Sequence, residues 1–256
     1  MSANTAFQMV NEQGWRRGFA NLLRHENAIW WRSRRWWVNV LIWLVLINGV
    51  LLATLSSPSM GNMEALATFA AVVGFFTGIG AIVTIQGAII DEKKSGTAAW
   101  IASKPVSRSA FILAKLVANV VAMLVITLVI QGAVAYLQFA ANGGAPALGP
   151  FVFGLALVGL HLLFYLALTL MLGTLFNERG AVIAIPLGIL FGGQFLMGYL
   201  GSLSEFLPWY LVMGPTLSSE AMLGQPLSTI TPIPATIVWI VVFIGIAIWR
   251  YQREEF

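Results

Sequence analysis

The sequence contains no cysteine among its 256 residues. This absence excludes disulfide bonds, thiolate metal ligands and a cysteine nucleophile. Charge is scarce as well, because Asp, Glu, Lys and Arg together make up 9% of the chain, whereas soluble proteins carry about 25%. With a mean hydropathy of +0.84, the chain has too little polar surface to face water on all sides. We therefore expect an integral membrane protein.

The sequence also lacks the common catalytic motifs. No GxxxxGK[ST] stretch is present, which excludes an ATP-binding P-loop. His25 and Glu26 would begin an HExxH zinc motif, but Ile29 stands where the second histidine would be needed. His161 is isolated within an apolar run and is expected to be structural. We therefore predict no catalytic residue, no metal site and no cofactor in this chain.

Six apolar runs are long enough to cross the hydrocarbon core of a bilayer, which takes about 20 residues. None has a charged residue at its middle, where each charge would cost about 2.5–3.5 kcal/mol. Lys115, near the start of the third run, is expected to lie in water or to snorkel. The predicted fold is all-α, with one transmembrane domain over 1–256 and spans at about 37–55, 65–90, 110–141, 151–176, 181–203 and 230–249.

All fourteen Lys and Arg residues fall on one side of this alternation of spans. The three loops of the other side contain only Glu64, Glu205 and Glu220 as charged residues. Basic loops face the cytoplasm, so we predict a multi-pass protein of the cytoplasmic (inner or plasma) membrane with both termini in the cytoplasm. The net charge of +4 then reflects topology and anionic lipid. The lipid bilayer is an expected partner, and nucleic acid is not.

Residues 1–36 include a predicted amphipathic helix on the membrane surface. Glu26 lies in the middle of its apolar face, which leaves two interpretations open. Either the helix bends there and Glu26 reaches water, or a basic residue of 93–115 pairs with it, because a buried unpaired charge is too costly. The apolar face, about 120° wide at 100° per residue, consists of Trp15, Phe19, Leu22, Leu23, Ile29 and Trp30.

Residues 204–229 form a predicted outer re-entrant segment before the last span. Their Pro, Gly and apolar side chains favour short helices that dip into the outer leaflet, which requires contact with protein or a cavity. Trp209 and Tyr210 are expected at the outer membrane interface.

Small residues recur every four positions in the second and fifth runs, a pattern that lets helix backbones approach closely. Packing within the chain and a contact between subunits both remain possible interpretations. The residues concerned are Ala70, Gly74, Gly78, Gly188 and Gly192.

Residues 91–109, between the second and third spans, are longer than a simple connector needs to be. Thr97 is a predicted N-cap of a short helix that displays Trp100 and Ile101 and ends before Pro105. Ser107 is a predicted cap of the helix that follows. The segment is either a loop that snorkels at the headgroups or a rigid helix that docks a cytoplasmic partner.

This segment resembles the cytoplasmic link of ABC exporter permeases of the ABC type 2 membrane-domain family. The matching residues are Glu92, Gly96, Thr97, Pro105, Ser107, Arg108 and Lys115. Glu26 in the N-terminal helix, the six spans and the outer segment also match. The resemblance implies a coupling helix that docks on a separate ATPase. Two copies of this ATPase would be present, and they would bind ATP and Mg. It also implies a second permease chain, identical or related. The coupling residues would be Glu92, Gly96, Thr97, Trp100, Ile101, Pro105 and Arg108.

The function implied is export of a hydrophobic or amphipathic substrate, driven by ATP that the partner hydrolyses. The substrate path would lie along the second and fifth spans. The alternative is a secondary transporter or channel without an ATPase, although such carriers usually place ionisable groups or broken helices at the bilayer midplane. The side chains expected along the path are Phe75, Phe76, Gln86, Gln194 and Phe195.

Overall fold

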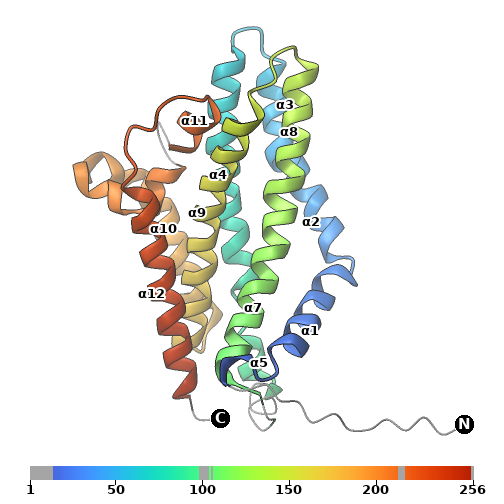
Figure 1. Ribbon diagram of the computed structural model, residues 1–256, viewed down its shortest axis with the longest axis vertical. Coiled ribbons are helices and arrows are strands. Elements are labelled where there is room, and N and C mark those ends of the chain that lie inside the picture. The colour runs from blue at the N-terminus through green and yellow to red at the C-terminus, as the bar shows by residue number, and fades with distance from the viewer. Residues whose placement is uncertain (1–13, 98–103, 105, 213–216, 255–256) are drawn as a thin grey trace, which may run out of the picture.

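The computed structural model describes residues 14–97, 104, 106–212 and 217–254. All regular secondary structure in these ranges is helical, and the long helices form one elongated bundle (Figure 1). The bundle consists of α2 (Arg35–Trp43), η2 (Leu44–Asn48) and α3 (Gly49–Leu55), then α4 (Asn62–Ile85) and α5 (Ile90–Lys94), then α7 (Arg108–Met123), η3 (Leu124–Val129) and α8 (Ile130–Ala141), and then α9 (Leu148–Leu175), α10 (Arg179–Leu200) and α12 (Pro232–Gln252).

Five stretches of the described chain are long and apolar enough to cross a membrane. A sixth is added if Arg179–Gly193 and Phe195–Phe206, which meet at a 57° bend, count as one span. The predicted all-α membrane fold is confirmed at this level. The five continuous stretches are Arg35–Leu55, Asn62–Lys94, Arg108–Ala141, Leu148–Leu175 and Pro232–Gln252.

The second span is not the unbroken helix over 65–90 that the sequence predicts. Helix α4 ends at Ile85, a turn covers 86–89, and α5 begins at Ile90. In this turn a Cβ on Gly87 would stand 2.5 Å from Oδ2 of Asp91. The Asp91 carboxylate thus folds back over the turn beside Gly87, an arrangement that hydropathy alone does not predict.

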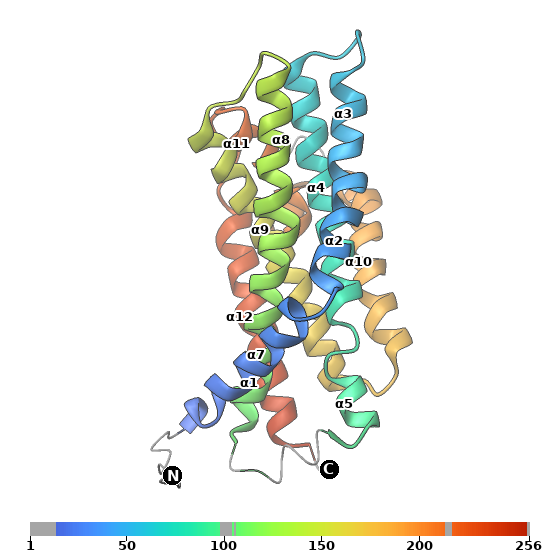
Figure 2. The same cartoon turned by 90° about the vertical axis from the view of Figure 1, so that its right-hand side faces the viewer.

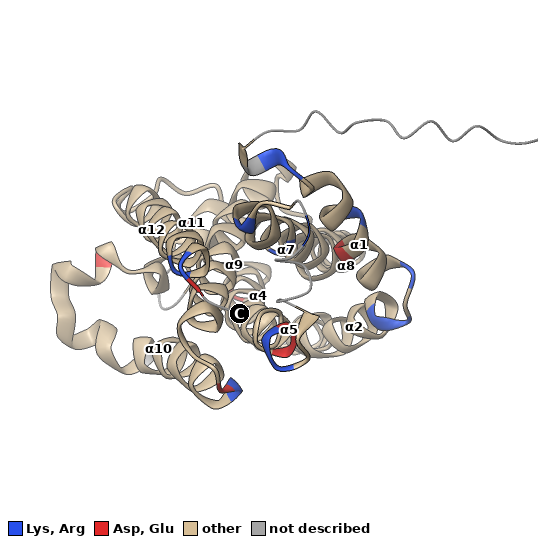
Figure 3. Ribbon diagram, turned by 90° about the horizontal axis from the view of Figure 1, so that it is seen from below, with Lys and Arg blue, Asp and Glu red and all other residues tan. Residues whose placement is uncertain are grey.

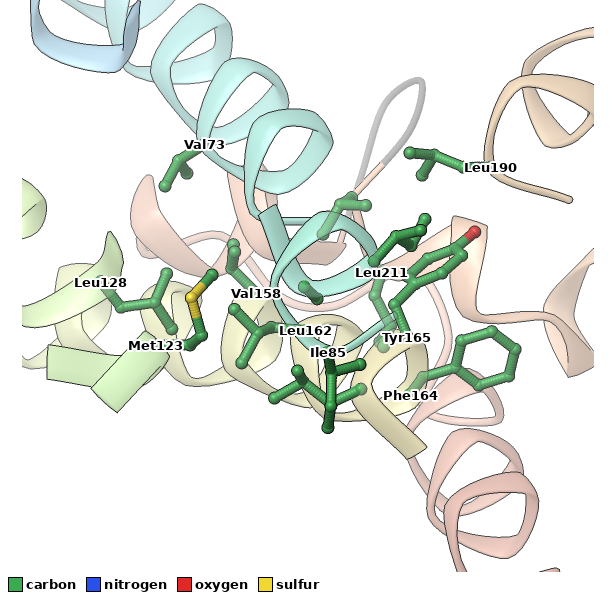
Figure 4. Packing of buried hydrophobic residues seen from close by; sticks show 14 of the residues in the cluster. Val73, Ile85, Met123, Leu128, Val158, Leu162, Phe164, Tyr165, Leu190 and Leu211 are labelled. Atoms are coloured by element: carbon green, nitrogen blue, oxygen red, sulfur yellow. The ribbon is translucent and has the colours of Figure 1, made fainter. Parts of the chain in front are cut away.

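Helix α9 is the central helix of the bundle. Its apolar side chains cover the whole circumference, which is typical of a buried helix, and 67% of its most apolar window is buried, compared with 17% for α12. Figure 4 shows Val158, Leu162, Phe164 and Tyr165 of α9 among apolar side chains from the neighbouring helices. The outward faces of α2, α3 and α12 keep large exposed apolar side chains, as expected of surfaces that meet lipid.

The outer segment folds into short helices, η4 (Gly201–Phe206), η5 (Pro208–Leu211) and α11 (Leu217–Met222). Trp209 is buried in the bundle, whereas a tryptophan of the expected outer aromatic belt would face lipid. Trp209 is 6% exposed, and its Nε1 donates a hydrogen bond of 3.2 Å to the Tyr165 hydroxyl. The reason is a glycine on α10: a Cβ at Gly193 would collide with the Trp209 ring, so only glycine admits the ring into the bundle.

The small residues of the second span pack within the chain. Ala70 is fully buried. A Cβ on Gly74 would meet Val212 of the outer segment, and one on Gly78 would meet Leu190 of α10. Gly188 and Gly192 of the fifth span differ, since nothing lies within 4 Å of a Cβ placed on either. Internal packing therefore explains the first set, and the subunit-contact interpretation stays open for the second.

Candidate functional site

The lower end of the bundle, as drawn in Figures 1 and 2, holds α1 (Phe19–Trp31), α5 and the end of α12. Seen from below, Lys, Arg, Asp and Glu residues of several helices face the viewer together (Figure 3). Helix α5 and the start of α7 belong to the segment 91–109 that the sequence analysis singled out.

Helix α1 begins four residues later than the predicted amphipathic helix. Gly18 has a left-handed backbone with φ 80°, a conformation that favours glycine, and it separates Trp15 from the helix. A Cβ on Gly18 would also press on Val106. Further along, α1 packs against α7, where Trp30 is 9% exposed and donates from Nε1 to Oδ1 of Asn119 at 3.2 Å. Part of the predicted lipid-facing surface is thus a contact with protein.

Glu26 has the basic partner that one of the two interpretations required. Nζ of Lys115 lies 2.7 Å from Oε1 of Glu26 and 2.5 Å from Oε1 of Glu92. The Lys115 side chain is only 4% exposed, so the expectation that it snorkels or lies in water was wrong. Its stem crosses apolar surface, with Nζ 5.1 Å from the centroid of the Phe111 ring. One lysine thus joins α1, α5 and α7.

Each charged residue of α5 pairs with a different part of the chain. Asp91 accepts from Nε of Arg179 at 2.9 Å, at the start of α10. Glu92 pairs with Lys115 of α7. Lys93 lies 2.8 Å from Glu254, just after α12, and donates 3.1 Å to the Thr174 carbonyl of α9. Lys94 lies 3.0 Å from Glu178, between α9 and α10.

The end of the segment is fixed to both ends of the described chain. Ser107 caps α7 as predicted, since its side chain accepts a hydrogen bond of 2.9 Å from the Ala110 amide. Its own amide donates 3.0 Å to the carbonyl of Arg17. The guanidinium of Arg108 donates to the carbonyls of Gln252 and Glu254 at 2.8 and 2.7 Å. A cation at these carbonyls stabilises the negative end of the α12 dipole.

The structure describes only part of the predicted coupling helix. Gly96 has φ 75°, which explains a glycine there. Thr97 has helical conformation, and the rest of the predicted short helix lies outside the described residues. Trp100, Ile101 and Pro105 lie outside the described residues.

The predicted substrate-path residues do not share one surface of the single chain. Phe75 contacts Phe191 edge-on, with ring centroids 5.4 Å apart, and this pair brings α4 next to α10. Phe76 turns instead toward Trp43 of α2, at 6.4 Å. Phe195 points outward and is 76% exposed. The Gln86 side-chain oxygen is buried without a hydrogen-bond partner in the described part of the chain, and the Gln194 side chain is not described.

Sequence reasoning missed most of the charged cluster. Lys93, Lys94 and Arg179 were counted only as topology signals and Asp91 was given no role, yet the ion pairs of these residues hold α5 against other elements. The spacing of the four consecutive charges on a short helix was the available signal, because successive residues point about 100° apart and so meet different neighbours. Within the described residues no group of three metal-ligating side chains is present. The ion pairs of the cluster join α1, α5, α7, the start of α10 and Glu254 after α12.

Comparison with known proteins gives this region a context. The family model described as ABC-2 family transporter protein matches residues 20–256. No curated protein matches the sequence. The match begins at the second residue of α1 and covers every span, the charged cluster and the outer segment. The chain therefore belongs to the ABC-2 transporter family and is the membrane-spanning permease component of an ABC transporter, a component that associates with an ABC ATPase.

Proposed function

We propose that this permease exports a hydrophobic or amphipathic substrate across the cytoplasmic membrane, with ATP hydrolysed by two copies of the partner ATPase. The observation that supports this most is the charged cluster around α5. Four consecutive residues, 91–94, connect the base of the link to α7, to α9 and the start of α10, and to the end of α12. A displacement of residues 95–106 by a docked ATPase would therefore move several spans together rather than one loop.

The second permease chain, identical or related, would pack on α10. This helix presents an apolar face with open space beside Gly188 and Gly192 and with Phe195 exposed. Small residues allow close approach of two helices in a membrane. The substrate path would then lie between α4 and α10 of the two chains. The chain itself would hold no cofactor, since ATP and Mg belong to the ATPase.

A secondary transporter or channel that works without an ATPase is the alternative. Among the buried polar residues of the spans, only His161 and Lys115 are ionisable, and Lys115 belongs to the cytoplasmic cluster. Carriers coupled to ions usually place such groups near the bilayer midplane. Transport by the purified chain without an ATPase would favour this alternative.

Single cysteines test the orientation, and the lack of native cysteine makes the background clean. Ala145 and Gly180 are both exposed and lie at opposite ends of the bundle, before α9 and at the start of α10. We expect Ala145→Cys to react with a membrane-impermeant thiol reagent outside intact cells, and Gly180→Cys to react only after the membrane is opened. Labelling of Gly180→Cys in intact cells would contradict the proposed topology.

Trp100 tests the coupling role of the link. Large aromatic anchors at protein interfaces often cost about 2 kcal/mol or more when truncated, so we expect Trp100→Ala to weaken ATPase binding about thirtyfold. Co-purification and substrate-stimulated ATP hydrolysis measure this effect. The matched control is Trp37→Ala, because Trp37 is 42% exposed on α2, away from the link. Equal ATPase binding by both variants would leave the link as a simple connector.

A further inference from the structure

A cavity of about 430 Å³ opens between α1, α2, α4, α5 and α7. Its polar lining includes both signs of charge, with Glu26, Glu92 and Lys115 on one side and Arg35 on another. Ile29 and Val83 contribute apolar wall. The cavity therefore has two separated signs of charge and an apolar side. A larger cavity of the bundle, by contrast, is lined almost entirely by apolar side chains of η3, α8 and α9.

On the carboxylate side of the cavity, two carboxylates share one cation. Glu26 and Glu92 both pair with the single ammonium of Lys115, while Asp91 pairs with Arg179. All three carboxylates line the cavity, so this side is suited to a ligand that brings both a positive charge and N–H donors.

The opposite charge stands at the start of α2. Arg35 is exposed, and no ion pair of its guanidinium is found in the described part of the chain. Figures 1 and 2 agree that α5 lies nearer the lower end of the bundle than the start of α2 does. Along the bundle axis the start of α2, with Arg35, thus lies further into the membrane-spanning region than α5, with Asp91 and Glu92.

We propose that this cavity binds a phospholipid of the cytoplasmic leaflet whose head group carries a primary ammonium, that is, a phosphatidylethanolamine-type lipid. In such a lipid the ammonium lies nearest the cytoplasm, the phosphate follows, and the acyl chains point into the bilayer. This order matches the carboxylates, Arg35 and the apolar wall. The orientation relies on the topology proposed above, but the binding site itself does not require an ATPase.

The test uses the full chain, purified in detergent and depleted of lipid. Lipids with identical acyl chains and phosphoethanolamine, phosphocholine or phosphoglycerol head groups are titrated and detected by native mass spectrometry. We expect phosphatidylethanolamine to bind about tenfold more tightly than the other two, because only it donates N–H bonds to the carboxylates and places phosphate at Arg35. Equal binding of the ethanolamine and choline lipids would overturn the proposal.

Two variants separate the charges. Arg35→Gln should weaken phosphatidylethanolamine binding about tenfold, whereas Arg34→Gln, at an exposed neighbour that does not line the cavity, should have no effect. Glu92→Gln leaves the Lys115–Glu26 pair in place and should abolish the preference for ethanolamine over choline. An equal loss in Arg34→Gln and Arg35→Gln would overturn the proposal. The proposal would also be overturned if Arg35→Gln changed the oligomeric mass but left lipid binding unchanged. That result would mean that a second copy of the chain covers the cavity.

Discussion

Replacement of Lys115 by Met is expected to lower the free energy of unfolding by about 3–5 kcal/mol. The Lys115 side chain is 4% exposed and is the only cation within ion-pair distance of both Glu26 and Glu92 among the described residues. Its removal leaves two carboxylates facing one another at a buried site, without the ammonium that offsets their desolvation. Thermal unfolding in detergent should show a melting temperature lower by roughly 10 °C.

The matched control is Lys94→Met. Lys94 also forms an ion pair, 3.0 Å from Glu178, but the two side chains are 53% and 80% exposed. Exposed pairs contribute less than about 1 kcal/mol, so this variant should unfold close to the parent. The triple variant Lys115→Met, Glu26→Gln, Glu92→Gln should recover most of the loss, because no buried charge remains. Equal melting temperatures for the two single variants would contradict the buried cluster.

Replacement of Gly154 by Leu is expected to separate α11 from α9. A Cβ at Gly154 would stand 2.6 Å from the backbone oxygen of Ser218 and 3.1 Å from the backbone nitrogen of Met222. A side chain can rotate away, but these backbone atoms can move only if the short helix α11 moves with them. Overpacking of this kind costs about 1–3 kcal/mol or more. We expect reduced thermal stability and new protease sensitivity in the outer segment.

Gly149→Leu provides the control on the same helix. Nothing lies within 4 Å of a Cβ at Gly149, and leucine is a better helix former than glycine. This variant should therefore unfold like the parent or slightly above it. If Gly154→Leu left both stability and protease resistance unchanged, the outer segment would not be seated on α9 as described.

Hydropathy and charge were sufficient to predict the membrane fold, because the transfer of a segment into the bilayer depends on that segment alone. A run of about 20 apolar residues has no alternative to a spanning helix, and this holds whatever the neighbours are. The predicted cap at Ser107 is a local effect, which needs only a hydroxyl before a helix. That a basic residue pairs with Glu26 follows from the cost of an unpaired buried charge, but the identity of that residue does not.

The predictions that failed all depended on what lies beside a residue. Lys115 resembles a snorkelling lysine in the sequence, since only folding brings α1 and α5 to its ammonium. In the sequence, Trp209 resembles an interface tryptophan. Its ring is buried because Gly193, sixteen positions earlier, has no Cβ to collide with it. The break at 86–89 likewise lies within one apolar run, so hydropathy does not reveal it. Composition by itself determined that the chain is a membrane helix bundle, because transfer to lipid is a property of each segment alone. The tertiary structure alone decided which charges are buried together, because ion pairing requires several segments to meet within a few ångströms.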